Sequence, residues 1–159
     1  MNYWLMKSEP ETFSVDALLK APHRTDHWEG VRNYQARNYM RDKMKLGDLA
    51  FFYHSSCKNP GIVGIMEIVR ESHPDRSAFD PASSYFDPKS TEEVPRWWMV
   101  SVQLIEKLKP MIPLSVLKTA APLKNMIVTK PGNRLSVMPV TKAEWQFIMK
   151  LKEKGSYDS

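Results

Sequence analysis

Three basic side chains follow one another at steps of four residues, and an indole stands ahead of them in the sequence. Arg37, Arg41 and Lys45 would cover about 80° of arc on an α-helix, so one helix face could contact successive phosphates of a nucleic acid. Trp28 precedes this row and Arg32 lies between them. An indole ring can stack on a planar base. The spacing is typical of nucleic-acid binding, although a solvent-exposed helix face would show the same pattern.

Other aromatic residues stand beside polar residues at the ends of the elements predicted below. A ring in such a place can stack on a base while its polar neighbours hydrogen-bond the base edge. The alternative for each ring is packing in the core, where most tryptophans lie. The rings in question are those of Trp28, Tyr34, Tyr53, Trp97 and Trp98.

Residues that could catalyse a reaction form no comparable pattern. His23 and His27 are four residues apart but lack the glutamate of a zinc-protease helix. Cys57 near His54 is more simply a small side chain in a loop, and Glu67 in an apolar run could be a buried acid or could point outward. The sequence contains no G-x-S-x-G motif. We therefore predict no catalytic residue, no metal site and no cofactor.

The composition limits the class of protein. The chain has 159 residues, of which 42% are hydrophobic, which is enough for one compact domain with a core. Its formal net charge is +5, and residues 101–159 hold 10 of the basic and 4 of the acidic residues. Cys57 is the single cysteine, so a reducing compartment is expected and we predict a cytoplasmic protein. The sequence has no signal-peptide pattern and no run of eighteen apolar residues, so no membrane partner is predicted.

Apolar, β-branched and aromatic runs predict the strands that position these residues. A strand is expected at residues 2–6, before Pro10 removes a backbone donor. Two runs at residues 49–54 and 62–69 predict a hairpin with a seven-residue polar loop. A further strand is predicted at residues 97–105, where alternate residues are apolar.

Capping residues predict where the helices begin and end. Ser14 can cap a short helix, and Asn33 can cap a second helix that ends at Gly47. Thr141 and Glu144 have the spacing of a capping box, which predicts a C-terminal helix.

The order of these elements indicates the fold class. Strands and helices do not alternate regularly and no glycine-rich turn joins a strand to a helix, which argues against a Rossmann or P-loop fold. Residues 73–95 contain four prolines and form a long connection, which is typically functional or mobile. We predict an α+β fold, with a small mixed β-barrel or strongly curved sheet and peripheral helices.

Stretches along nearly the whole chain resemble the EVE domain family. They are YWLMKSEP (3–10), WEGVRNYQARN (28–38), FYHSSCKNPGIVGI (52–65), YFDPKS (85–90), WWMVSV (97–102) and NRLSVMPV (133–140). The resemblance implies a PUA-like fold and kinship with the YTH domain, in which an aromatic cage holds a methylated base. It also implies a single domain over residues 1–152, followed by a short polar tail at 153–159.

The resemblance implies that a modified base in DNA or RNA, such as methylated or hydroxymethylated cytosine, is bound without catalysis. Trp28 falls where one wall of the cage is expected. If Trp28 is a wall of such a cage, its replacement by Ala should abolish base discrimination and leave the thermal midpoint nearly unchanged. A large loss of stability would instead mark Trp28 as a core residue. The expected base-binding residues are Lys7, Ser8, Trp28, Val31, Asn33, Tyr53, His54, Ser55, Leu135 and Ser136, and the expected phosphate-binding residues are Arg32, Arg37, Arg41 and Lys58.

Two alternative functions stay open at this point. A PUA-type RNA-binding module without preference for a modification would show affinity that falls steeply with salt. An enzyme acting on a modified base or a nucleotide would use His54 or Glu67. Replacement of His54 by Gln separates this second alternative, because a binding module should lose only affinity.

Overall fold

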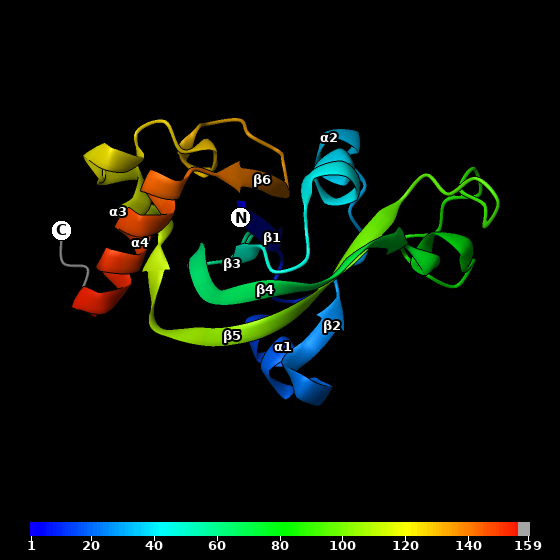
Figure 1. The fold of residues 1–159 in the computed structure, drawn as a ribbon, viewed down its shortest axis with the longest axis horizontal. Helices are drawn as coiled ribbons and strands as arrows, with labels where there is room; N and C mark the ends of the chain where they lie inside the picture. Colours follow the sequence, from blue (N-terminus) through cyan, green and yellow to red (C-terminus); the bar gives the residue numbers. More distant parts are fainter. Residues whose placement is uncertain (156–159) are drawn as a thin grey trace.

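A single six-stranded sheet forms the centre of the molecule (Figure 1). The computed structural model describes residues 1–155. Strands β1 and β3 are parallel, and the other neighbouring strands are antiparallel. In sheet order the strands are β2 (Thr25–His27), β5 (Trp98–Pro113), β4 (Gly61–Pro74), β3 (Leu49–His54), β1 (Tyr3–Ser8) and β6 (Val137–Val140).

Strands β4 and β5 give the sheet its curvature. Their pairing contains four shifts of register, and each such irregularity bends and twists a strand pair. The curve of β5 below the rest of the sheet is visible in Figure 1. The described part of the sheet ends at β2 on one side and β6 on the other. The predicted α+β fold is thus confirmed in its form with a strongly curved sheet, and the sheet is not closed into a barrel.

Within residues 1–155, four α-helices lie around the sheet, and three of them begin at the predicted capping residues. The side chains of Ser14 and Asn33 accept hydrogen bonds from the third residue beyond each of them, and Thr141 forms the predicted capping box with Glu144. The helices are α1 (Val15–Lys20), α2 (Tyr34–Asn38), α3 (Leu114–Thr119) and α4 (Lys142–Lys154). A π-helical turn extends α2 over Tyr39–Lys43, and 3-10 turns lie at Pro22–Arg24, Arg76–Phe79, Ala121–Leu123 and Ile127–Thr129.

Some predicted boundaries were wrong. The helix after Asn33 was expected to reach Gly47 but ends at Lys43, because the Lys45 amide donates to the buried carboxylate of Asp48 instead of continuing the helix. The C-terminal helix runs from Lys142 to Lys154. Residues 156–159 of the expected tail lie outside the described residues. No helix in the described range is long and apolar enough to cross a bilayer.

Alternate residues of the central strands pack on opposite faces of the sheet, as the pleat of a strand requires. The first face, which we call the α1/α2 face, is covered by Val15 and Leu18 of α1 and by Ala36 of α2. The second, the α3/α4 face, is covered by Leu117 of α3 and by Trp145 of α4. In β3 this alternation sends Phe52 to the α1/α2 face, while Phe51 and Tyr53 pack on the α3/α4 face.

Candidate nucleic-acid interface

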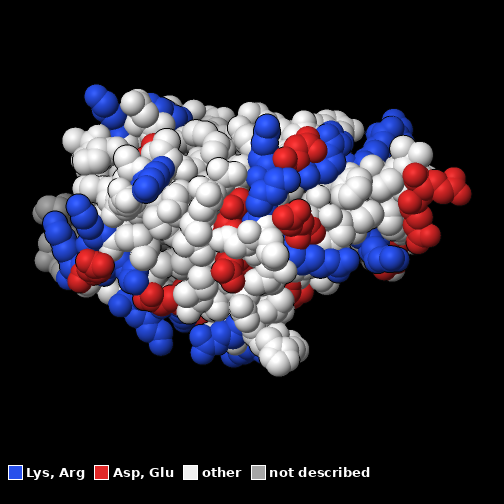
Figure 2. Space-filling view, viewed as in Figure 1, with Lys and Arg blue, Asp and Glu red and all other residues white. Residues whose placement is uncertain are grey.

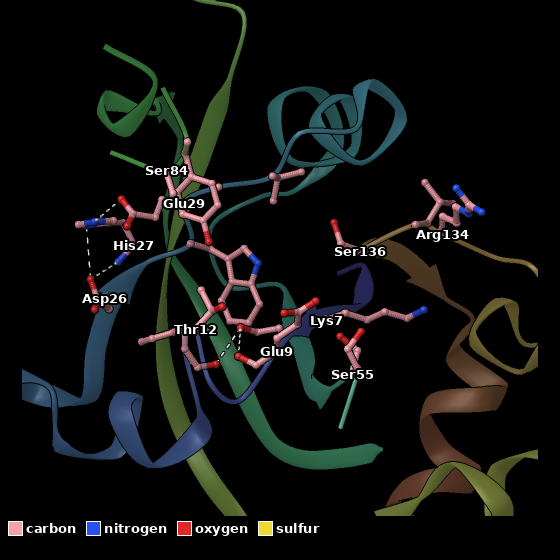
Figure 3. A pocket seen from close by; sticks show the side chains of 18 of the residues that line it. Lys7, Glu9, Thr12, Asp26, His27, Glu29, Ser55, Ser84, Arg134 and Ser136 are labelled. Carbon is pink, nitrogen blue, oxygen red and sulfur yellow. Dashed lines mark hydrogen bonds and ion pairs between the residues drawn. The ribbon is translucent and has the colours of Figure 1, made fainter. Parts of the chain in front are cut away.

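A cavity of about 760 Å³ opens at the edge of the sheet where the parallel strands β1 and β3 end (Figure 3). Two backbone hydrogen bonds hold its segments together. The Ser55 amide donates to the Ser8 carbonyl at 3.1 Å, and the Lys7 amide donates to the Ser136 carbonyl at 2.7 Å. Because β6 is antiparallel to β1, the segment that enters β6 reaches the same edge of the sheet.

The structure brings most of the expected base-binding residues to this cavity. They come from the ends of β1 and β3, from the segment after β2 and from the segment before β6. The expected residues that line the cavity are Lys7, Ser8, Trp28, Val31, Ser55, Leu135 and Ser136.

Trp28 belongs to the core as well as to the cavity. Its side chain is 4% exposed and packs edge-on against Phe52 at 5.0 Å and Phe13 at 5.8 Å between ring centroids. Trp28 therefore lines the cavity as expected and also has the core packing that was its alternative, because the indole fills part of the α1/α2 face. Phe13 and Tyr85 also line the cavity, so it has several aromatic residues around it.

Gly30 and Tyr85 form one wall of the cavity through close contact. Gly30 has a φ of +83°, which favours glycine, and a Cβ placed on it would lie 2.5 Å from the Tyr85 ring. Its amide donates to the carboxylate of the fully buried Asp75 at 2.8 Å. The connection between β4 and β5 is thereby fixed against the cavity.

Arg32 completes this wall and is not placed as a phosphate-binding residue. Its guanidinium forms a 3.1 Å ion pair with Asp75 and donates to the Tyr85 carbonyl at 2.7 Å. The guanidinium carbon also lies 5.4 Å from the centre of the Tyr85 ring and 5.3 Å from that of Trp97. These partners occupy the guanidinium inside the fold, and Arg32 is not among the residues that line the cavity.

The ionisation of Asp75 reflects its partners. Burial alone would raise the pKa of Asp75. Hydrogen bonds from Ser77, from the Gly30 amide and from Arg32 outweigh burial and lower this pKa from its ordinary value. The carboxylate therefore stays charged at neutral pH and can hold both Gly30 and Arg32.

Acidic side chains occupy the side of the cavity next to β2. His27 lies between two carboxylates, with its ring nitrogens 3.4 Å from Asp26 and 3.4 Å from Glu29. Figure 3 shows this group across the cavity from Lys7 and Arg134. Asp26 and Glu29 give this side a negative potential, and their oxygens can accept hydrogen bonds from an exocyclic amino group.

Three of the expected base-binding residues lie elsewhere. Asn33 uses its side chain to cap α2, accepting from the Ala36 amide at 3.0 Å. Tyr53 is 3% exposed and packs on the α3/α4 face, where burial raises its pKa to about 12. His54 accepts a hydrogen bond from the Val15 amide at 3.1 Å, so it supports the start of α1. None of the three lines the cavity in the described part of the chain.

The remaining expected phosphate-binding residues are also outside the cavity. Arg37 donates to the Arg96 carbonyl at 2.9 Å, and Arg41 pairs with its neighbour Asp42 at 2.8 Å. Lys58 lines a separate hollow beside α3. Figure 2 shows several basic side chains near the end formed by α4, and acidic and basic side chains next to each other at the opposite end, in the β4–β5 connection. Between these ends, basic and acidic side chains are intermixed.

Several lining residues were missed by the sequence analysis although most lie inside the stretches that carried the resemblance. Glu9 is part of YWLMKSEP, Glu29 is part of WEG, Tyr85 begins YFDPKS, and Arg134 is part of NRLS. Position within a family motif was the signal that could have found them. The missed lining residues are Glu9, Thr12, Phe13, Asp26, His27, Glu29, Ser56, Ser84, Tyr85, Asn133 and Arg134.

The cavity offers stacking surfaces and hydrogen-bonding groups for a small planar ligand. Among residues 1–155, no group of three or more His, Cys, Asp and Glu side chains is placed to hold a metal ion. His54 and Glu67, the two candidates for catalysis, are both outside the cavity lining. The arrangement is therefore suited to recognition by stacking and hydrogen bonds.

Comparison with known proteins gives consistent relatives. The sequence pattern of the EVE domain matches residues 2–151. Thymocyte nuclear protein 1 from Homo sapiens is 46% identical over 170 residues, which cover 96% of this chain and 75% of that protein.

Solved structures share the fold. The human THYN1 protein in complex with 5-methylcytosine-containing DNA superposes with a TM-score of 0.90 at 46% identity, covering 96% of this chain and 98% of that one. The YTH domain of the Zygosaccharomyces rouxii MRB1 protein, solved with N6-methyladenosine RNA, gives a TM-score of 0.54 at 13% identity over 98% of this chain and 89% of that one. At this low identity the second likeness concerns the fold alone.

Proposed function

The chain belongs to the EVE domain family, and from this premise we propose that it is a non-catalytic nucleic-acid-binding module that takes a modified base into the cavity beside Trp28. The observation that carries the proposal is the meeting of Phe13, Trp28 and Tyr85 with polar side chains in one cavity at the end of the sheet. The relative solved with 5-methylcytosine-containing DNA supports cytosine as the parent base.

Stacking supplies the affinity for the base. A base flipped out of a duplex loses a few kcal/mol of stacking and pairing, and an aromatic contact regains about 1–3 kcal/mol. A single-stranded target avoids part of that loss. We therefore expect single-stranded or locally unpaired nucleic acid to bind more tightly than a perfect duplex.

Hydrogen bonds and apolar contacts would give selectivity. The carboxylates of Glu9, Asp26 and Glu29 line the cavity, and a carboxylate can accept a hydrogen bond from the amino group of cytosine. Val31 and the aromatic rings offer an apolar surface for a methyl substituent, and the lining serines can hydrogen-bond a hydroxymethyl group.

The two residues that the enzyme hypothesis named, His54 and Glu67, lie outside this cavity. The imidazole of His54 accepts from a backbone amide at the start of α1, and Glu67 lies in the middle of β4 opposite Leu49 and Gln103. Neither of the two residues that an enzyme hypothesis would use lines the cavity. The proposed role is therefore recognition.

The test is equilibrium binding to short DNA and RNA strands that differ only in one base. The panel carries unmodified, methylated or hydroxymethylated cytosine, or methylated adenine, in single and double strands. We expect one modified strand to bind at least about tenfold more tightly than its parent, which corresponds to about 1.4 kcal/mol.

A matched pair of variants locates the preference. Trp28→Phe should reduce the ratio between modified and parent strands, whereas Trp145→Phe, on the α3/α4 face, should leave it unchanged. Equal binding of all strands with a steep dependence on salt would refute the modified-base proposal and favour an RNA-binding module without modification preference.

A further inference from the structure

The cavity has a second, polar side. This side lies toward the α3/α4 face of the sheet, whereas Trp28 lies on the α1/α2 face. Lys7 and Tyr53 are partners in the β1–β3 register, and Lys7 lies beside the Tyr53 ring with its ammonium nitrogen 5.8 Å from the ring centre. Tyr53 packs on the α3/α4 face, whereas Trp28 packs on the α1/α2 face. Lys7 is therefore separated from Trp28 by the strand ends.

Two serines share the position of Lys7. Ser136 lies opposite Lys7, because the Lys7 amide donates to the Ser136 carbonyl where β1 pairs with β6. Ser55 is two residues beyond Tyr53, and residues two apart in an extended chain point to the same face. Figure 3 shows Lys7, Ser55, Ser136 and Arg134 together on one side of the cavity.

Charge divides the cavity along the same line. Arg134 and Lys7 are the two basic residues among its lining side chains, excluding histidine, and both are on this polar side. Asp26 and Glu29 lie on the opposite side around His27, and Glu9, the third acidic residue of the lining, lies between this group and Lys7 in Figure 3. An anion entering the cavity is therefore attracted to the polar side and repelled from the β2 side.

Lys7 and Arg134 also differ from Arg32, Arg37 and Arg41, because their charged groups have no ion-pair or hydrogen-bond partner in the fold among residues 1–155. Among residues 1–155, the side chains of Lys7 and Arg134 form no ion pair and no hydrogen bond. Only the backbone amide of Lys7 is hydrogen-bonded, to Ser136. By contrast, Arg32, Arg37 and Arg41 already have partners within the fold. Burial lowers the pKa of the Lys7 ammonium, and an anion close to it would offset this loss of hydration.

We propose that Lys7, Ser55, Ser136 and Arg134 form a phosphate subsite that holds a backbone phosphate beside the base bound at Trp28. This inference rests on the proposed function and adds the path of the nucleic-acid backbone to it. The ammonium supplies a point charge, the guanidinium supplies paired N–H donors, and the two hydroxyls supply further donors to the phosphate oxygens.

The test measures the affinity for a single-stranded oligonucleotide, carrying one 5-methylcytosine, across a series of salt concentrations. Lys7→Gln and Arg134→Gln remove one charge each, and Arg41→Gln is the control because Arg41 lies outside the cavity and pairs with Asp42. Each subsite variant should bind several-fold more weakly at low salt. The slope of log affinity against log salt should fall by about 0.7, as expected for one fewer phosphate contact on a single strand.

A neutral backbone linkage gives a second measurement on the same contact. Methylphosphonate linkages are placed one at a time on each side of the modified base, which removes the charge of a single phosphate. One position should weaken binding to the wild-type protein and to Arg41→Gln but have much less effect on Lys7→Gln. Lys7→Arg should restore the salt slope because it keeps the positive charge, and thermal midpoints establish that the variants are folded.

The two proposals fail in different ways. The ratio of affinities for the modified and parent strands tests the function, whereas the salt slope and the linkage effect test the subsite. Wild-type slope and affinity in both Lys7→Gln and Arg134→Gln would overturn the phosphate subsite and leave base recognition standing. A loss of the modified-to-parent ratio in Lys7→Gln, with the slope unchanged, would show that Lys7 contacts the base and would also overturn it.

Discussion

The two faces of the sheet use alternate residues of the same strands but end differently at the edge where β1 and β3 finish. On the α3/α4 face, Phe51 stacks on Trp145 with ring centroids 3.9 Å apart, and α4 covers the pair. On the α1/α2 face, Phe52 packs against Trp28, and Trp28 also lines the cavity. One aromatic pair therefore lies within a closed core, whereas the other connects a core to the cavity that is proposed to bind the base.

Adjacent residues of β3 belong to different faces of the sheet. Phe52 faces the indole of Trp28, while Tyr53, the next residue, packs on the opposite face. A shift of one residue along a strand changes the face of a side chain. Nearness in sequence to a binding surface therefore does not place a residue in it.

The largest effect expected from this comparison is the loss of the Trp145 side chain. Trp145 is 5% exposed and stacks on Phe51 and also on Tyr3 at 4.8 Å. Trp145→Ala should lower the free energy of unfolding by about 3–5 kcal/mol, because a large cavity is left in the core. Binding measured well below the midpoint should be unchanged. Denaturant unfolding and oligonucleotide binding check the two halves, and a weaker affinity in a folded variant would contradict the separation of the faces.

Trp28→Ala should combine a loss of stability with a loss of binding. Its indole is as buried as that of Trp145, but the cavity borders it, so we expect a destabilisation near the lower end of the range, about 3 kcal/mol. Affinity for the modified strand should also fall by about 1–3 kcal/mol through lost stacking. An unchanged thermal midpoint would contradict the assignment of Trp28 to the core, and unchanged affinity would remove it from the base-binding site.

The sequence predicted the local features of the fold well where one short pattern decides the outcome. The bounds of β3 and the capping box at Thr141 and Glu144 were predicted correctly. Strand β2 was missed because Thr25–His27 is short and polar, and its existence depends on pairing with β5. Strand β4 runs on to Pro74 through polar residues for the same reason, since pairing with β5 and not local hydrophobicity sustains it.

The candidate site was predictable only in part, because its members depend on tertiary contacts. The resemblance identified Trp28, Ser55 and Ser136 as neighbours of a cavity, since they lie in family motifs. It could not reveal that Arg32 is occupied by the buried Asp75, which lies 43 residues further along the chain. Charge alone made Arg32 resemble a phosphate ligand, and the partner that changes its role is visible only in the folded structure.

Asp75→Asn should weaken the cavity wall formed by Gly30 and Tyr85, which Asp75 and Arg32 support. Loss of the charged acceptor for Gly30 and Arg32 should cost about 1–3 kcal/mol at neutral pH. The folded-state pKa of Asp75 is lowered, so its stabilisation is complete above the unfolded value of about 3.9 and is lost as the pH falls through the folded value. Unfolding between pH 2.5 and 7 should therefore show a shallower acid decline in the variant.

Asp42→Asn is the control for this prediction, because Asp42 is exposed and pairs only with its neighbour on the surface. It should leave stability nearly unchanged, because an ion pair between exposed neighbours contributes little. If Asp75→Asn keeps both the neutral stability and the acid decline of the wild type, the buried carboxylate does not hold the cavity wall. A reduced ratio of affinities for modified and parent strands in Asp75→Asn would link the wall to recognition.

The smallest expected effect concerns His54, which supports the start of α1 but does not line the cavity. Burial lowers the pKa of His54, Asp16 acts to raise it and Lys107 to lower it, so the folded protein favours the neutral ring that accepts from the Val15 amide. Stability from this group is present above the unfolded value of about 6.5 and declines as the pH falls toward the folded value. His54→Gln keeps an acceptor without titrating, so its thermal midpoint should change less between pH 7 and pH 5 than that of the wild type. His73→Gln is the comparison variant for this pH dependence of the thermal midpoint, because burial also lowers the pKa of His73. The affinity of His54→Gln for the modified strand should change by less than about threefold, or 0.6 kcal/mol, because His54 does not line the cavity. A larger loss of affinity would show that His54 contacts the ligand, and it would contradict the distinction between side chains that support this face and side chains that bind.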